Sequence, residues 1–233
     1  MKTDPTFCQR FSDGMDMFVS ILKSARGDPD AWETSIKKFE AQDQIDPPKK
    51  DAIMFIGSSS FTFWSTLEQD MAPLPVINRG FGGARLPDVV HYMERIVLPY
   101  RPRAVVLFAG TNDISGSKPA SAHQVYDGYL AFVQRVQETL PEAIIYFVAI
   151  TPTLARWKYW SIAAEANRLI QEHTQSDPSL RFIDLTEHLL GADGKPDRSL
   201  YRIDRLHPNA KGYLKWTAVI KPRLEAELSF NEG

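Results

Sequence analysis

Residues 52–60 read AIMFIGSSS: an unbroken apolar run, then a glycine and three serines. A short continuous apolar run bounded by turn residues is typical of a strand buried on both faces, as in a parallel sheet covered by helices. Ligands of such sheets bind beyond the carboxyl ends of the strands. The serines therefore stand where the chemistry of this chain is expected.

The rest of the main sequence repeats this alternation of apolar runs and helical patterns. Further predicted strands cover residues 76–77, 104–109, 144–150 and 182–183, and apolar residues at helical spacing lie within 86–97, 125–136 and 162–170. Parallel strands need helical crossovers, so the pattern predicts an α/β protein with a three-layer α/β/α sandwich.

A proline pair marks the clearest boundary. Pro47, Pro48 and two lysines separate an N-terminal segment from the main domain, because proline cannot continue a helix. We predict an N-terminal helical extension over residues 1–46 and a main domain over 47–233. Trp32, Ile36 and Phe39 lie at helical spacing, so the extension is expected to pack on the domain.

Composition narrows the class of protein. Hydrophobic residues make up 43% of the chain and charged residues 24%, as in ordinary globular proteins. The net charge of -2 and the lack of a dense Lys/Arg cluster argue against nucleic acid as a partner. A single cysteine, Cys8, excludes an intrachain disulfide framework and a Cys-based zinc site. No apolar run is long enough to span a membrane and no signal peptide is evident, so a cytoplasmic location is expected.

Polar residues follow the first three predicted strands. Ser59 stands at a helix start, where N–H groups would favour an oxyanion, although serine is also a common helix cap. Residues 78–83, NRGFGG, form either a ligand cradle or a plain connection, and they lack the context of a dinucleotide fingerprint. Asn112 ends the third strand and is either a side-chain donor or an Asx-turn residue.

A fourth group of candidate functional residues lies near the C-terminus, in the sequence DRLHP. Asp204 precedes His207 by three residues, so its carboxylate can accept a hydrogen bond from Nδ1–H of the imidazole. Nε2 is then free to act as a base. This arrangement favours a catalytic histidine over a structural one.

These blocks, in this order, resemble the SGNH hydrolases, also called the GDSL esterase/lipase family. Ser59 matches the family's nucleophile, and Ser58 and Ser60 replace the usual Asp and Leu. Gly83, Asn112 and the pair Asp204 and His207 match the later blocks. The resemblance implies a flavodoxin-like fold with a central, mostly parallel five-stranded sheet. Ser58 in place of Asp leaves the substrate class open, and among three adjacent serines Ser58 or Ser60 is the fallback nucleophile.

The resemblance also implies a mechanism. Ser59 attacks an ester, His207 is its base, Asp204 orients the base, and an acyl-enzyme forms. The oxyanion hole combines the N–H groups of Ser59 and Gly83 with the amide of Asn112. These are all protein groups, so no metal or cofactor is expected.

Substrate specificity is expected from the segment after the fourth strand. Its aromatics could stack on a sugar or line an acyl pocket, or pack in the core; the candidates are Arg156, Trp157, Tyr159 and Trp160. Arg79 and Arg85 flank the glycine loop and could bind an anionic group of the substrate or form ion pairs.

We therefore expect a serine esterase for small carboxylic esters, with a short-acyl or acetyl group. The alternatives are a lysophospholipase or thioesterase, and a non-catalytic ligand-binding protein on the same scaffold. The expected partner is a small-molecule ester, and the sequence leaves a homo-oligomer open.

Overall fold

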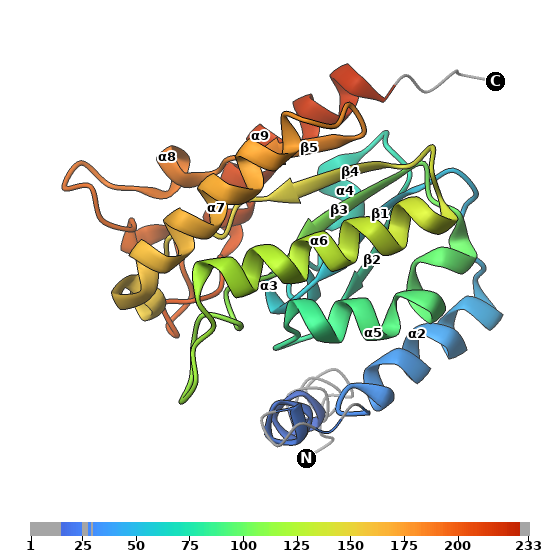
Figure 1. Cartoon of the computed structure of the whole chain (residues 1–233), viewed down its shortest axis with the longest axis horizontal. Helices are drawn as coiled ribbons and strands as arrows, with labels where there is room; N and C mark the ends of the chain where they lie inside the picture. The colour runs from blue at the N-terminus through green and yellow to red at the C-terminus, as the bar shows by residue number, and fades with distance from the viewer. Residues whose placement is uncertain (1–14, 25–27, 29, 229–233) are drawn as a thin grey trace, which may run out of the picture.

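The computed structural model describes residues 15–24, 28 and 30–228. Its centre is a five-stranded sheet in the order β2-β1-β3-β4-β5 (Figure 1). All four strand pairings are parallel. The predicted sandwich is confirmed, and its sheet is wholly parallel among the described residues. The strands are β1 (Ile53–Gly57), β2 (Val76–Gly80), β3 (Ala104–Phe108), β4 (Ile144–Val148) and β5 (Leu180–Ile183).

Helices cover both faces of the sheet. One face carries α5 (Leu86–Ile96), α6 (Ala122–Thr139) and α7 (Trp160–Thr174), and Figure 1 shows α5 and α6 in front of the strands. The other face carries α3 (Ser59–Thr62), α4 (Leu67–Met71), α8 (Thr186–Leu189) and α9 (Ala210–Glu227). The three helices predicted from apolar spacing are those of the first face. Short 3₁₀ turns complete the chain: η1 (Leu98–Tyr100), η2 (Leu154–Tyr159) and η3 (Arg198–Leu200).

The second strand is longer than predicted. Asn78 and Arg79 continue β2 although they are polar, because β2 is an edge strand and both side chains find partners. The Asn78 amide donates to the Phe61 carbonyl at 2.8 Å and its oxygen accepts from Gly80 N–H at 2.9 Å. The Arg79 guanidinium pairs with Asp43. Apolar content alone therefore underestimates an edge strand.

The described part of the segment before the sheet contains two helices. Residues 15–24 are helical, and α2 (Glu33–Ile45) follows them and lies against α5. Trp32 and Ile36 are fully buried, and Arg95 of α5 bridges Glu33 and Glu40. The division of the chain at residue 46 stays a prediction. Cys8 lies outside the described residues.

None of the helices within residues 15–24 and 30–228 has the length and apolar content needed to cross a bilayer.

Candidate functional site

Ser59 owes its position to a glycine at the end of β1. Gly57 has a φ of +146°, and a Cβ there would lie 2.0 Å from the Phe108 carbonyl oxygen on β3. The next residue, Ser58, is extended and donates its N–H to the same carbonyl at 3.0 Å. The chain then turns into α3, whose first residue is Ser59. This helix has only one turn, so its N–H groups act locally rather than through a long dipole.

A hydrogen-bonded chain joins Ser59 to the C-terminal loop. Nε2 of His207 lies 2.7 Å from Ser59 Oγ, and Nδ1 lies 2.7 Å from Asp204 Oδ2. Because a carboxylate accepts, we assign the proton to Nδ1, which leaves Nε2 to accept from the serine hydroxyl. The backbone N–H groups of Leu206 and His207 hold the other oxygen of Asp204 at 2.9 and 3.0 Å. Of the three adjacent serines, Ser59 makes the contact with the imidazole.

Burial and charge set the protonation of this chain. Burial lowers the pKa of His207 below its ordinary 6.5, and the opposing effect of Asp204 does not compensate. Burial alone would raise the pKa of Asp204, but the hydrogen bonds from His207 and from two backbone N–H groups outweigh it and lower that pKa. At neutral pH the pair is therefore a neutral imidazole beside a carboxylate, which is the form that a general base requires.

Hydrogen bonds connect the loops that follow β1, β2 and β3 at the carboxyl ends of these strands. Phe81 N–H donates to the Gly57 carbonyl at 2.9 Å, which links the second loop to the first. The Asn112 amide donates to the Ala84 carbonyl at 3.0 Å, which links the third loop to the second. Gly83 has a φ of +89°, a conformation that few side chains tolerate. Asn112 has a second amide hydrogen, so it can also donate to a ligand.

Beside Asn112 lies a buried carboxyl. Asp113 Oδ1 accepts from Leu86 N–H at 3.1 Å at the start of α5, whereas Oδ2 has no hydrogen-bond partner among the described residues. Burial raises the pKa of Asp113 to about 6. The group fastens the third loop to α5.

The four predicted substrate contacts in the segment after β4 have different surroundings in the structure. Tyr159 and Trp160 pack partly buried against the core, as the packing alternative predicted. Trp157 stacks on Trp160 at 6.0 Å between ring centroids. Arg156 is half-buried, and its Nε is buried without a hydrogen-bond partner among the described residues. Burial lowers its pKa, and its charge contributes to lowering the pKa of His207.

The two arginines beside the glycine loop have structural partners. Arg79 is buried, pairs with Asp43 and lies over the rings of Phe39 and Tyr100 at 5.1 Å. Arg85 caps α5, where its backbone N–H donates to Asp88 at 2.9 Å. Of the two readings offered by the sequence, Arg79 follows the ion-pair reading.

Sequence reasoning missed three contributors to the surroundings of the site. The helix of residues 15–24 lies on the glycine loop: Cβ atoms added at Gly82 and Gly83 would lie 2.2 Å from Met17 Sδ and 2.6 Å from Ile21 Cγ1. The Phe63 ring meets the His207 ring edge-on at 4.8 Å between centroids. Arg202 donates to the Phe63 carbonyl at 3.3 Å. No motif spacing marks these contacts, because they join segments far apart in the chain.

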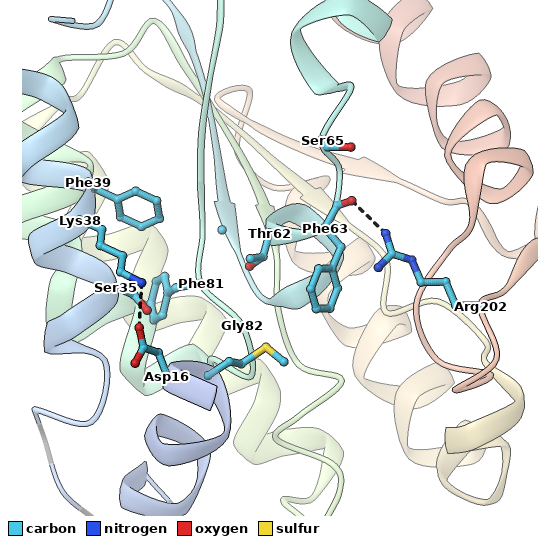
Figure 2. A pocket seen from close by; sticks show the side chains of 12 residues that line it. Asp16, Ser35, Lys38, Phe39, Thr62, Phe63, Ser65, Phe81, Gly82 and Arg202 are labelled. Carbon is cyan, nitrogen blue, oxygen red and sulfur yellow. Dashed lines mark hydrogen bonds and ion pairs between the residues drawn. The ribbon is translucent and has the colours of Figure 1, made fainter. Parts of the chain in front are cut away.

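A cavity of about 730 Å³ opens beside these residues, with Phe63 and Gly82 in its wall (Figure 2). Ser59 and His207 are not among the residues that line the cavity. The cavity therefore adjoins the hydrogen-bonded residues Ser59, His207 and Asp204 without containing them. Within the described residues, no group of three His, Cys, Asp or Glu side chains could hold a metal ion.

Comparison with known proteins adds the family. Residues 53–215 match the GDSL-like Lipase/Acylhydrolase family. The human platelet-activating factor acetylhydrolase IB subunit alpha1 is 28% identical over 191 residues, which cover 78% of this chain and 78% of that protein. The bovine protein of the same name is also 28% identical, over 78% of this chain and 77% of its own length.

Solved structures share the fold. A GDSL-like lipase from Bacteroides thetaiotaomicron superposes with a TM-score of 0.70 at 17% identity, over 83% of this chain and 98% of that one. A mutant of Axe2, an acetyl-xylooligosaccharide esterase from Geobacillus Stearmophilus, gives a TM-score of 0.61 at 15% identity, over 78% and 98%. The matched range, residues 53–215, contains Ser59, Asp204 and His207 and the three loops that follow β1, β2 and β3. The chain therefore belongs to the GDSL-like lipase/acylhydrolase family and is a carboxylic ester hydrolase.

Proposed function

We propose that the protein hydrolyses small carboxylic esters, with an acetyl or other short acyl group, through an acyl-enzyme on Ser59. One observation carries the proposal: two contacts of 2.7 Å connect Ser59 Oγ, the imidazole of His207 and the carboxylate of Asp204 in one line. This is the geometry of a nucleophile, a general base and the group that orients the base.

The reaction follows from these positions. Ser59 Oγ attacks the ester carbonyl carbon while Nε2 of His207 takes the hydroxyl proton. The tetrahedral intermediate collapses when His207 returns the proton to the leaving alcohol, and an acyl-serine remains. Water, deprotonated by the same nitrogen, then attacks the acyl carbon and releases the acid with Ser59 restored. The carboxylate of Asp204 stabilises the imidazolium in both steps.

The oxyanion that forms in each step needs donors. We assign this role to the backbone N–H groups of Ser59 and Gly83 and to the amide of Asn112. The proposal is supported by the hydrogen bond from Asn112 to Ala84, which holds the amide beside the glycine loop. Donors fixed before the reaction need no reorganisation as charge develops, and this is the source of their effect.

Asn112→Ala is expected to lower kcat by about 10² to 10³ with little change in KM, because the lost donor acts mainly on the transition state. Steady-state kinetics on p-nitrophenyl acetate measures this. The melting temperature of the variant should stay near that of the native chain, which separates lost catalysis from lost folding. A fully active variant would exclude Asn112 from the oxyanion hole.

The pH dependence should report His207. Protonated imidazole cannot accept the serine proton, so kcat/KM should fall tenfold per pH unit on the acid side. Because burial lowers the pKa of His207, the midpoint of this limb should lie below 6.5. A midpoint well above 6.5 would contradict the assignment of the base.

Contacts with the substrate are proposed for two residues after β4. Arg156 has a buried donor without a protein partner, and Trp157 lies outside the core cluster that takes up Tyr159 and Trp160. The backbone N–H of Ala155 donates to the Arg205 carbonyl at 3.0 Å, which keeps this segment beside the loop of His207. The relatives named as acetylhydrolase and as acetyl-xylooligosaccharide esterase support an acetyl ester as the first substrate to test.

A fluorophosphonate probe tests the proposal directly. It should label the folded protein, and mass spectrometry should place the label on Ser59. A panel of p-nitrophenyl esters and acetylated sugars then ranks substrates. Folded protein that hydrolyses none of them and takes no label on Ser59 would instead be the non-catalytic ligand-binding alternative.

A further inference from the structure

The cavity beside the proposed reaction centre is built by two parts of the chain. One wall comes from the family-matched region, with Thr62, Phe63 and Ser65 around α3 and with the loop that begins at Gly80. The facing wall comes from residues that precede this region. Met17 lies in the helix of residues 15–24. Ser35 and Phe39 lie on α2 (Figure 2).

Two residues of the cavity lining adjoin the proposed catalytic groups. Phe63 lines the cavity and also meets the His207 ring at 4.8 Å. Gly82 lines it and immediately precedes Gly83, the proposed oxyanion donor. An ester whose carbonyl carbon is held at Ser59 could therefore extend its acyl chain or its alcohol past Phe63 or Gly82 into the cavity.

The lining offers an apolar occupant several contacts. Four of its side chains are large and apolar: Met17, Phe39, Phe63 and Phe81. Lys38 is a lining residue whose ammonium forms an ion pair with Asp16 at 2.8 Å, so the pair brings no net charge (Figure 2). Arg202 lies over the Phe63 ring at 4.8 Å, and it donates to the carbonyl of that residue.

Size argues in the same direction. The cavity volume of about 730 Å³ lies within the range of sites that enclose whole small molecules. An acetyl group would leave most of it empty. The part of the substrate that fills the cavity must therefore be larger than the acyl group of the simplest acetate ester.

We propose that this cavity binds an apolar chain carried by the ester, and that the helix of residues 15–24 together with α2 selects for such substrates. The inference rests on the proposed ester hydrolysis at Ser59, and not on the proposed length of the acyl group. The chain can belong to the acyl group or to the alcohol, and in both cases its burial between the two walls supplies the same free energy.

Two series of esters test the inference: p-nitrophenyl esters of acids from acetate to decanoate, and acetate esters of alcohols of the same lengths. In the series that uses the cavity, kcat/KM should rise about fourfold per methylene, from about 0.8 kcal/mol per buried CH₂. The other series should stay nearly flat. Flat profiles in both series would overturn the proposal.

A matched pair of variants localises the effect to the cavity. Ser35→Phe places a ring into the cavity from α2, whereas Thr34→Phe places the same ring on the exposed side of that helix. Ser35→Phe should abolish the rise with chain length, whereas Thr34→Phe should behave as the native chain. Ser65→Phe fills the cavity from the opposite wall and replaces Ser35→Phe if that variant melts early. Equal profiles for the cavity-filling variants and Thr34→Phe would contradict the proposal.

Calorimetric titration with octan-1-ol separates this inference from the esterase function. If Ser35→Phe binds octan-1-ol more weakly than Thr34→Phe does, the apolar site is supported even if no ester is hydrolysed. The absence of hydrolysis would then refute the proposed function alone. Hydrolysis of acetate esters with no chain-length effect and no difference in octan-1-ol binding would refute the cavity alone.

Discussion

Ser59→Ala should reduce kcat for p-nitrophenyl acetate by about 10⁶, close to the background rate, because the attacking oxygen is lost. The pair Asp204 and His207 remains in place, but it has no hydroxyl from which to take a proton. Initial rates with concentrated enzyme, measured against buffer alone, resolve a loss of this size.

The neighbouring serines provide the control. Ser58→Ala and Ser60→Ala should keep most of the activity, since the structure places only Ser59 Oγ at 2.7 Å from the imidazole among these three residues. The fluorophosphonate label should disappear in Ser59→Ala and persist in the other two. An active, labelled Ser59→Ala protein would move the nucleophile to another residue.

Asp204→Asn should lower kcat by about 10⁴ while the fold is retained. An amide in this position can donate to Nδ1, which would move the imidazole proton to Nε2, where it faces the serine and blocks proton transfer. Steady-state kinetics across the pH range measures the loss.

Asp197→Asn is a suitable comparison for Asp204→Asn. Asp197 caps the short turn η3 by accepting from Ser199 N–H at 2.8 Å and has no contact with His207 in the structure. Its substitution should leave kcat nearly unchanged. A fall of less than tenfold in Asp204→Asn would show that the base does not depend on this carboxylate.

The layered architecture was predictable because buried parallel strands are apolar throughout. The runs at residues 52–56 and 104–109 predicted β1 and β3 to within about one residue. The prediction for β2 stopped at residue 77, because Asn78 and Arg79 look like loop residues until their partners Phe61 and Asp43 are known. Those partners are remote in the chain, so no local pattern reveals them.

The candidate site was predictable where residues act in short motifs, and not where they act by packing. Asp204 and His207 lie three residues apart, and the hydrogen bond between them follows from that spacing. Phe63 meets His207 across the fold, and Met17 covers a glycine more than sixty positions away. For Trp157 and Trp160, the sequence offered packing and substrate contact equally, because both residues are aromatic and both follow β4. Their surroundings, which only the fold defines, separate them.

The glycine at position 57 has a consequence for how this enzyme can change over time. Even a methyl group there would collide with the neighbouring strand, so position 57, two residues before the proposed nucleophile, tolerates almost no variation. On α2, by contrast, Thr34 is exposed and Ser35 is only partly buried. On the proposal that the cavity selects substrates, substitutions in α2 can redirect the enzyme toward new esters, while the reaction proposed at Ser59 is inherited unchanged.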